Sequence, residues 1–204
     1  MKIYFSADYH LDHANIIKYT DRPFIHPGDL NEEKEWVSLE IKRKRCQEMN
    51  YTIIDNHNKV LTYEDKLYHI GDFSYRYTGP AIYWEQFLNG KIVHIRGNHD
   101  NNNGTNTYIT HCLMEFGGVL FYVVHKPPED NQVDTLQAHI ISMCNGIICG
   151  HVHNSWKWKW ITVQYLNHKV RKPCINVGID VWDYKPISIH SILKLLAKIN
   201  KGLV

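Results

Sequence analysis

The sequence predicts an α/β protein, in one domain spanning residues 1–204, built from buried strands that alternate with helices. Short apolar runs rich in β-branched or aromatic residues recur along the chain, and they end in Gly, Asp or His. Runs of this length are typical of strands buried on both faces. Helical patterns separate several of these runs, which favours a layered α/β arrangement. We find no linker, internal repeat or low-complexity segment that divides the chain.

The predicted elements follow one another in a regular order. Six segments are predicted as strands, residues 2–8, 66–72, 91–100, 119–125, 146–153 and 173–178. Four segments are predicted as helices, residues 31–57, 78–90, 135–144 and 188–199. In the first helix, Glu32 and Glu33 fall in the first turn, where acidic side chains suit the positive end of the helix dipole. The second helix has Pro80 near its start and Gly90 after its end, the usual asymmetry of a helix.

The composition favours a soluble protein of the cytoplasm. The net charge of +2 gives the chain no overall attraction to nucleic acid or to an anionic membrane. Five cysteines without a CxxC pair argue for a reducing compartment and against a disulfide framework or a Cys-rich zinc site. The first charged side chain after the initial apolar run, Asp8, comes too early for a signal peptide. No stretch approaches the roughly 20 apolar residues of a membrane-spanning helix, so we expect no membrane partner.

Polar side chains follow five of the predicted strands, at the point where each strand ends. They are Asp8 and His10, then Asp72, then Asn98, His99 and Asp100, then His125, and finally His151 and His153. In α/β sheets, the ligand site lies beyond the carboxyl ends of the strands, so we expect these groups to converge on one crevice. Histidine is the commonest side-chain ligand for transition metals. The pattern therefore predicts a metal centre at this edge.

The types of these residues suit phosphate chemistry. Oxygen and imidazole ligands without a thiolate favour Mn²⁺, Fe or Zn²⁺ over a soft metal. Two metals about 3.5–4 Å apart need a bridging carboxylate, and such pairs clamp the oxygens of an in-line phosphoryl displacement. Among the expected ligands only Asp8 and Asp72 carry negative charge, so two divalent cations would keep a net positive charge that attracts phosphate.

The remaining histidines are expected to play no part in the site. His69 and His94 lie inside predicted strands, and we interpret them as core histidines with satisfied hydrogen bonds. Five others lie in helical or loop patterns with no evident partner, namely His13, His57, His111, His139 and His190.

As an ordered set, these motifs resemble those of the calcineurin-like metallophosphoesterases. The set comprises Asp8-x-His10, Gly71-Asp72, Gly97-Asn98-His99-Asp100, His125 and Gly150-His151-x-His153. It spans residues 8–153, and residues 22–24 and 176–187 resemble the small bacterial and phage members of that superfamily. The resemblance implies two packed mixed β-sheets flanked by helices, as a four-layer α-β-β-α sandwich, with a dinuclear metal centre.

The resemblance also implies a role for each residue. One divalent ion would be held by Asp8, His10 and His153. The other would be held by Asn98, His125 and His151, with Asp72 bridging the two. Mn²⁺ is expected first, with Fe, Zn²⁺ or Mg²⁺ as alternatives. A metal-bridging hydroxide would attack phosphorus, His99 would protonate the leaving oxygen or stabilise its charge, and Asp100 would orient the His99 ring.

The chain departs from the family pattern after Asp72. Many relatives carry GDxxDRG, whose acid and arginine help to position the phosphate, whereas this chain reads GDFSYRY, with Tyr75 at the acid position and Arg76 after it. This argues against a Ser/Thr protein phosphatase. Arg22 and Asn15 are candidates to take over phosphate contacts, since arginine grips phosphate in a bidentate way. A purely structural Arg22, next to a proline, is the alternative.

The stretch WKWKW at residues 156–160 lies outside these motifs. On a strand, Trp156, Trp158 and Trp160 would share one face. Three interpretations stay open. The face is buried under the following segment, it joins two copies of the chain in a homo-oligomer, or it stacks on a base or aromatic group of the substrate.

Together these features predict a hydrolase that cleaves a phosphate ester, and a diester or small nucleotide is favoured over a phosphoprotein. One alternative is a nuclease acting on RNA or DNA ends. Another is a non-catalytic protein-binding scaffold that retains the metal site. The scaffold is disfavoured because all seven expected ligands and His99 are present. A structural zinc protein is disfavoured because such sites usually use closely spaced Cys and His.

Overall fold

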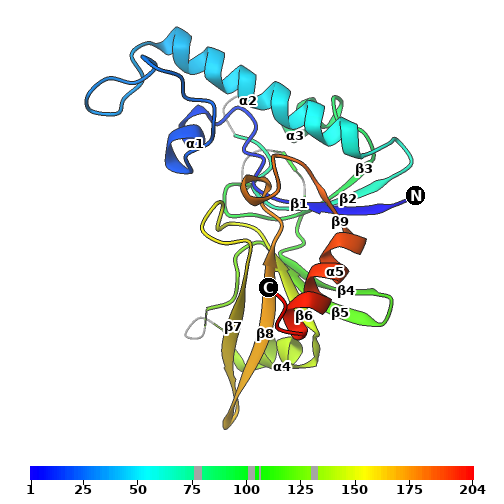
Figure 1. The fold of residues 1–204 in the computed structure, drawn as a ribbon. Helices are drawn as coiled ribbons and strands as arrows, with labels where there is room; N and C mark the ends of the chain where they lie inside the picture. Colours follow the sequence, from blue (N-terminus) through cyan, green and yellow to red (C-terminus); the bar gives the residue numbers. More distant parts are fainter. Residues whose placement is uncertain (76–79, 101–103, 106, 130–132) are drawn as a thin grey trace.

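Two mixed β-sheets pack face to face in the computed structural model, which describes residues 1–75, 80–100, 104–105, 107–129 and 133–204 (Figure 1). The first sheet has the order β3-β2-β1-β9. Its strands are β1 (Ile3–Ser6), β2 (Lys66–Ile70), β3 (Lys91–Ile95) and β9 (Ile187–Ser188). The first three are parallel and β9 is antiparallel to β1.

The second sheet has the order β4-β5-β6-β8-β7. Its strands are β4 (His111–Phe116), β5 (Val119–Val124), β6 (Gly146–Cys149), β7 (Trp158–Tyr165) and β8 (His168–Asn176). The central strands β5, β6 and β8 are parallel, and each edge strand is antiparallel to its neighbour. The two sheets confirm the mixed α/β architecture expected from the sequence.

Helices cover the outer faces of both sheets. The first sheet packs against α1 (Ala14–Tyr19), α2 (Leu39–Val60) and α3 (Ala81–Glu85). The second packs against α4 (Thr135–Met143), and α5 (Ile189–Asn200) contributes to the core between the sheets. Successive residues of one strand enter different cores: Tyr4 faces the helices, and Phe5 faces the other sheet. Because both faces are buried, the strands are continuous apolar runs in the sequence.

The long helix α2 begins at Leu39, so the predicted start at residue 31 is wrong. Residues before it form a tight turn in which Asn31 and Glu35 are linked by two hydrogen bonds, one through the Asn31 side chain. Lys34 adopts a positive φ of 61° there, which a helix does not allow. The N-cap is Ser38, whose hydroxyl accepts a hydrogen bond from the Ile41 N–H. Local side-chain bonds therefore outweigh the preference of the two glutamates for a first helical turn.

Other element boundaries also differ from the prediction. The helix expected at residues 78–90 is the short α3, capped by Pro80, and residues 78 and 79 lie outside the described part. The strand expected at residues 91–100 ends at Ile95. The elements α1, β4, β7 and β9 were not among the predicted segments. In β4, exposed and half-buried residues alternate, so no continuous apolar run marked it.

The tryptophans of residues 156–160 do not share one environment. Trp158 and Trp160 begin β7 and pack against the core between the sheets, and their rings meet edge to face at 6.5 Å. Trp156 precedes the strand and packs against the core beneath α4, so the expected common face is wrong for this residue. All three are half-buried, which favours the buried-face interpretation.

Of three histidines outside the predicted site, one makes the hydrogen bond expected of it and two differ from expectation. His94 bonds through Nε2 to Glu85 at 2.8 Å, as expected of a satisfied histidine. His69 is fully buried, but neither ring nitrogen has a hydrogen-bond partner among the described residues, so its expected satisfaction is wrong. His57 has partners where none was expected, since it bonds to the Tyr9 hydroxyl and to the Asn89 carbonyl. Within the described segments, no helix has the length and apolar character needed to cross a membrane.

Candidate metal centre

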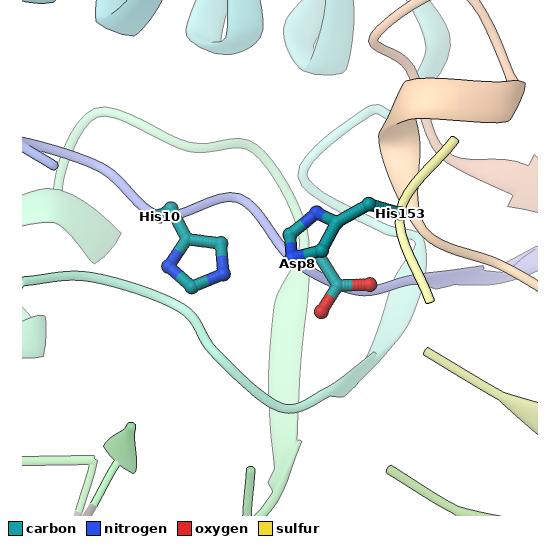
Figure 2. A group of neighbouring side chains, drawn as sticks. All are labelled: Asp8, His10 and His153. Atoms are coloured by element: carbon teal, nitrogen blue, oxygen red, sulfur yellow. The ribbon is translucent and has the colours of Figure 1, made fainter. Parts of the chain in front are cut away.

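The seven predicted ligands lie in loops that follow the parallel strands, and six of them form two compact groups. Asp8, His10 and His153 make the first group, shown in Figure 2. Asp72, His125 and His151 make the second. Within each group the potential ligand atoms all lie within 4.8 Å of one another. The structure thus brings together side chains that are up to 145 positions apart, since the first group runs from residue 8 to residue 153.

Asp72 lies between the two groups. Its Oδ2 is 3.6 Å from His10 Nε2 in the first group and 3.3 Å from His125 Nε2 in the second. Asn98 joins the second group, because its Oδ1 lies 3.1 Å from His125 Nε2 and 2.9 Å from His151 Nδ1. The carboxylate is therefore placed where a dinuclear centre requires a bridging ligand.

The donor atoms fit divalent cations. His10 Nε2 is buried and has no hydrogen-bond partner among the described residues, which costs about 1–3 kcal/mol for a polar atom without compensation. Burial, followed by the positive charge of Arg22, holds the pKa of His10 well below its usual range. Burial likewise lowers the pKa of His151. Neutral imidazole is the form that binds metals, and a cation would satisfy the unpartnered nitrogen.

Two other groups of the centre have raised pKa values, so protons compete with a cation for them. Burial raises the pKa of Asp8 to about 6. Burial also disfavours the charged ring of His125, but the hydrogen bond to Asp72 and the nearby Asp8 outweigh it and raise the pKa of His125 to about 9. Metal affinity should therefore depend on pH.

A second layer of contacts orients the ligand rings. His153 donates from Nδ1 to Asp180 Oδ2 at 3.0 Å, and His125 donates from Nδ1 to the Ile70 carbonyl at 2.6 Å. In each ring the remaining nitrogen, Nε2, is left for a metal. Burial favours a neutral Asp180, but Arg22 and His153 outweigh it and lower its pKa. Asp180 was not predicted as a site residue. It lies in the 3₁₀ helix η2 (Ile179–Val181). The available signal was an acidic residue within the apolar stretch after β8.

Arg22 has a structural role, so its predicted phosphate contact is contradicted. The side chain is fully buried and pairs with Asp180 through Nε at 2.8 Å and Nη2 at 3.2 Å. The guanidinium also donates to the carbonyls of Asp8 and Tyr9 and to the Met49 sulfur. These contacts use all five N–H groups, so none remains for a substrate.

Asp100 secures the loop that carries the bridging ligand. Its carboxylate accepts hydrogen bonds from the backbone N–H groups of Asp72, Phe73 and Gly97 at 2.7–3.0 Å. This role was not predicted, and orientation of the His99 ring by Asp100 stays a prediction. His99 is exposed, its ring lies 5.5 Å from that of His10, and its N–H donates to Asp72 Oδ1 at 2.8 Å.

Glycines allow the loops to approach the ligands closely. A Cβ on Gly97 would collide with Asp72, at both its Oδ1 and its backbone nitrogen. A Cβ on Gly178 would lie 2.6 Å from Asp8 Oδ2. Only a residue without a side chain fits these two positions.

Five of the ligands themselves adopt left-handed backbone conformations. The φ angles are 59° for Asp8, 49° for His10, 57° for Asp72, 72° for His151 and 46° for His153. Each such residue costs roughly 1–2 kcal/mol. Strain of this kind is concentrated at functional sites, because it points side chains where a regular strand or helix cannot.

His13 lies at the edge of the centre, so its expected absence from the site is wrong. Its Nδ1 is 3.3 Å from His10 Nδ1, and its ring stacks on Tyr75 with centroids 4.5 Å apart. Burial lowers its pKa to about 4. Asn15 follows on α1, where its side-chain oxygen accepts a hydrogen bond from Trp36, and its phosphate contact stays a prediction. Arg76 lies outside the described residues.

Comparison with known proteins identifies a matching family and several similar chains. A family model described as the calcineurin-like phosphoesterase superfamily domain matches residues 1–168. The chain is 33% identical over 199 residues to an uncharacterised protein of Methanocaldococcus jannaschii, covering 97% of this chain and 92% of that one. A protein of unknown function from Aquifex aeolicus has a similar structure, with 25% identity, a TM-score of 0.62 and coverage of 95% and 98%. An archaeal phosphodiesterase matches with 20% identity, a TM-score of 0.40 and coverage of 87% and 84%.

Proposed function

The chain belongs to the calcineurin-like phosphoesterase superfamily, and we propose that it is a metal-dependent phosphodiesterase acting on a nucleotide or another small phosphodiester. The observation that carries this proposal is the Asp72 carboxylate, which lies between two groups of ligands. A lone metal-binding cluster would not need such a bridge. Two-metal centres are suited to displacement at phosphorus because they act on both the attacking and the leaving oxygen.

The proposed ligands form two sets, one for each divalent ion. Asp8, His10 and His153 hold one ion, and Asn98, His125 and His151 hold the other, with Asp72 shared. Bound divalent ions supply a Lewis acid and make a water nucleophilic at neutral pH. Their four positive charges exceed the two negative charges of Asp8 and Asp72, so the centre attracts an anionic phosphate. Mn²⁺ is the proposed ion, with Fe, Zn²⁺ or Mg²⁺ as alternatives, and imidazole and oxygen donors without a thiolate argue against a soft metal.

His99 is the proposed proton donor to the leaving oxygen. It is exposed beside the ligands, so a substrate can reach its ring. The hydrogen bond from its backbone N–H to Asp72 Oδ1 fixes its position relative to the bridging carboxylate. General acid catalysis by a positioned histidine typically contributes about 10²–10⁴-fold. We therefore expect His99 to affect turnover more than metal binding.

Hydrolysis of bis-p-nitrophenyl phosphate tests the proposal directly. The purified protein is stripped of metal, reloaded with Mn²⁺, Zn²⁺ or Mg²⁺, and compared with the Asp72→Asn and His99→Ala variants. Asp55→Asn and His190→Ala are matched controls, because both side chains are exposed on the surface, away from the ligand groups. Metal content is measured alongside turnover.

The outcomes separate the proposed function from its alternatives. We expect two metals per chain, turnover that needs metal, and loss of turnover in both site variants, with two metals retained in His99→Ala. Cleavage of single-stranded oligonucleotides from their ends, faster than that of the small diester, would favour a nuclease. Two bound metals without turnover of any phosphoester would favour a non-catalytic scaffold. Failure to bind metal would overturn the proposal.

A further inference from the structure

A cavity of about 550 Å³ lies beside the second ligand group. Asn98, His125 and His151 form one part of its lining, and Arg96, Thr110 and Lys126 form another. The first ligand group does not line it, so the cavity extends to one side of the metal centre. Its volume falls within the range of sites that bind small organic ligands. The cavity therefore offers room for a part of the substrate next to the ester that is cleaved.

Arg96 is held at this cavity without an acidic partner. Its backbone N–H donates to the Ile109 carbonyl at 2.7 Å, which fixes the main chain directly before Gly97 and Asn98. The side chain is half-buried, and its guanidinium makes no hydrogen bond or ion pair with another described residue. A guanidinium presents a planar fork of donors that matches phosphate. Arg96 is thus available to an anion that enters the cavity.

Lys126 adds a second positive charge to the same wall. It directly follows the ligand His125, and its ammonium lies 3.4 Å from Glu129 Oε1. Both side chains of this pair are about half exposed, at 49% and 52%, and pairs so exposed contribute little stability. Lys126 adds positive charge on the side of the cavity that an entering phosphate would meet. None of the described residues that line the cavity is acidic.

We propose that this cavity binds a second phosphate group of the substrate. The substrate class is then a nucleotide-sized phosphoester that carries two phosphates, one cleaved at the ligand groups and one bound by Arg96 and Lys126. This inference rests on the proposed phosphoesterase function. Arg96 grips the second phosphate in a bidentate way, and Lys126 contributes a point charge. Arg96 is accordingly a specificity-determining residue.

Equilibrium titration with two nucleotides tests the inference. The metal-loaded protein is titrated with thymidine 3′,5′-bisphosphate and with thymidine 5′-monophosphate. The titrations use the His99→Ala variant so that neither nucleotide is hydrolysed during the measurement. Arg96→Met and Arg96→Lys are compared with Arg43→Met, an exposed arginine on α2. We expect the bisphosphate to bind at least about tenfold more tightly than the monophosphate, as a charge-assisted contact predicts. Arg96→Met should abolish this preference, Arg96→Lys should restore part of it, and Arg43→Met should leave it unchanged.

Two results would overturn the inference. One is equal affinity for the two nucleotides in the protein with Arg96 intact. The other is an equal loss for both nucleotides in Arg96→Met, which would assign Arg96 to the cleaved phosphate. Lys126→Met provides a second variant in case Arg96→Met does not fold. If Lys126→Met and Arg96→Lys both keep the full preference for the bisphosphate over the monophosphate, the proposal is also contradicted.

The failure of this inference is distinguishable from failure of the proposed function. Bis-p-nitrophenyl phosphate carries no second phosphate, so its hydrolysis should not depend on the anion contacts of Arg96 and Lys126. Turnover of that diester together with equal nucleotide affinities would overturn the second-phosphate site alone. A preference for the bisphosphate without any turnover would overturn the phosphodiesterase and leave the anion site in place.

Discussion

His153 donates a hydrogen bond from Nδ1 to Asp180 Oδ2 at 3.0 Å, and this contact determines which ring nitrogen faces the metal centre. Asp180 is in turn held by the buried Arg22, whose Nε lies 2.8 Å from Oδ1. A chain of three side chains therefore connects the interior of the protein to a metal ligand. An outer carboxylate of this kind fixes the tautomer of a histidine and raises its basicity toward a metal.

Replacement of Asp180 by asparagine should weaken the first metal site. The substitution keeps the shape but removes the charge that orients His153, and loss of such an outer contact typically lowers metal affinity by about 10–100-fold. Titration of stripped protein with Mn²⁺ measures this change, and the site at His125 and His151 should be affected less. Asp183→Asn is the matched control, since its carboxylate is 87% exposed. Unchanged affinity in Asp180→Asn would show that His153 does not bind the metal.

Replacement of Arg22 by methionine should affect stability and leave substrate binding intact. The variant leaves Asp180 buried without its cation, and removal of one partner of a buried pair typically costs about 3–5 kcal/mol. Urea unfolding of metal-free protein measures this loss, with Arg43→Met as an exposed control. At saturating Mn²⁺, KM for bis-p-nitrophenyl phosphate should stay the same. A raised KM with unchanged stability would instead support the phosphate contact suggested by the sequence.

The two groups of candidate ligands could be predicted from the sequence because their polar residues follow apolar runs, within a few positions of the strand ends. Asp72 and His125 end two such runs, and the sheet brings their carboxyl ends together whatever the exact strand boundaries are. The two-sheet arrangement needed the ordered motifs, since apolar runs alone do not say which strands are neighbours. The pairing of β6 with β8, for example, passes over β7 and follows from contacts that no local pattern encodes.

The contacts of the supporting residues could not be predicted because they join distant segments. Arg22 and Asp180 are 158 positions apart, and although a structural Arg22 was one alternative, no local pattern named Asp180 as its partner. Asn176 shows the same difficulty: its side chain donates to the carbonyls of His153 and Trp156 and accepts from the Gly178 N–H. The start of α2 was misplaced for a different reason, since the side-chain bond of Asn31 decides it.

Replacement of Gly97 by alanine should disable the metal centre. The added Cβ would overlap Asp72 at its backbone nitrogen, which cannot move aside, and overpacking of this kind typically costs about 1–3 kcal/mol. Metal content and turnover should both fall, because Asp72 is the proposed shared ligand. Gly28→Ala is the control: Gly28 has a φ of 85° and open space around its Cα, so it should lose roughly 1–2 kcal/mol from backbone strain without loss of metal. Full metal content in Gly97→Ala would contradict this account of the loop.

The buried His57 should make the protein less stable as the pH falls. Burial lowers its pKa from 6.5 to about 4, while its two ring nitrogens bond to the Tyr9 hydroxyl and the Asn89 carbonyl at 2.8 Å each. Between these two pH values the unfolded chain takes up a proton that the folded chain does not. The stability contributed by His57 is therefore present in full above pH 6.5 and lost progressively toward pH 4, by up to about 3 kcal/mol.

Urea unfolding of the metal-free protein at several pH values between 4 and 7 measures this dependence. His57→Gln should be less stable at pH 7, because it disturbs a buried hydrogen-bonded site. It should also lose less stability on acidification, by the equivalent of one proton, because the titrating group is gone. Other buried groups contribute equally to both proteins and cancel in the comparison. The exposed His190→Gln should keep the dependence of the unmodified protein. An identical pH dependence in His57→Gln would mean that His57 titrates alike in the folded and unfolded chains, against the burial and bonding that the structure gives it.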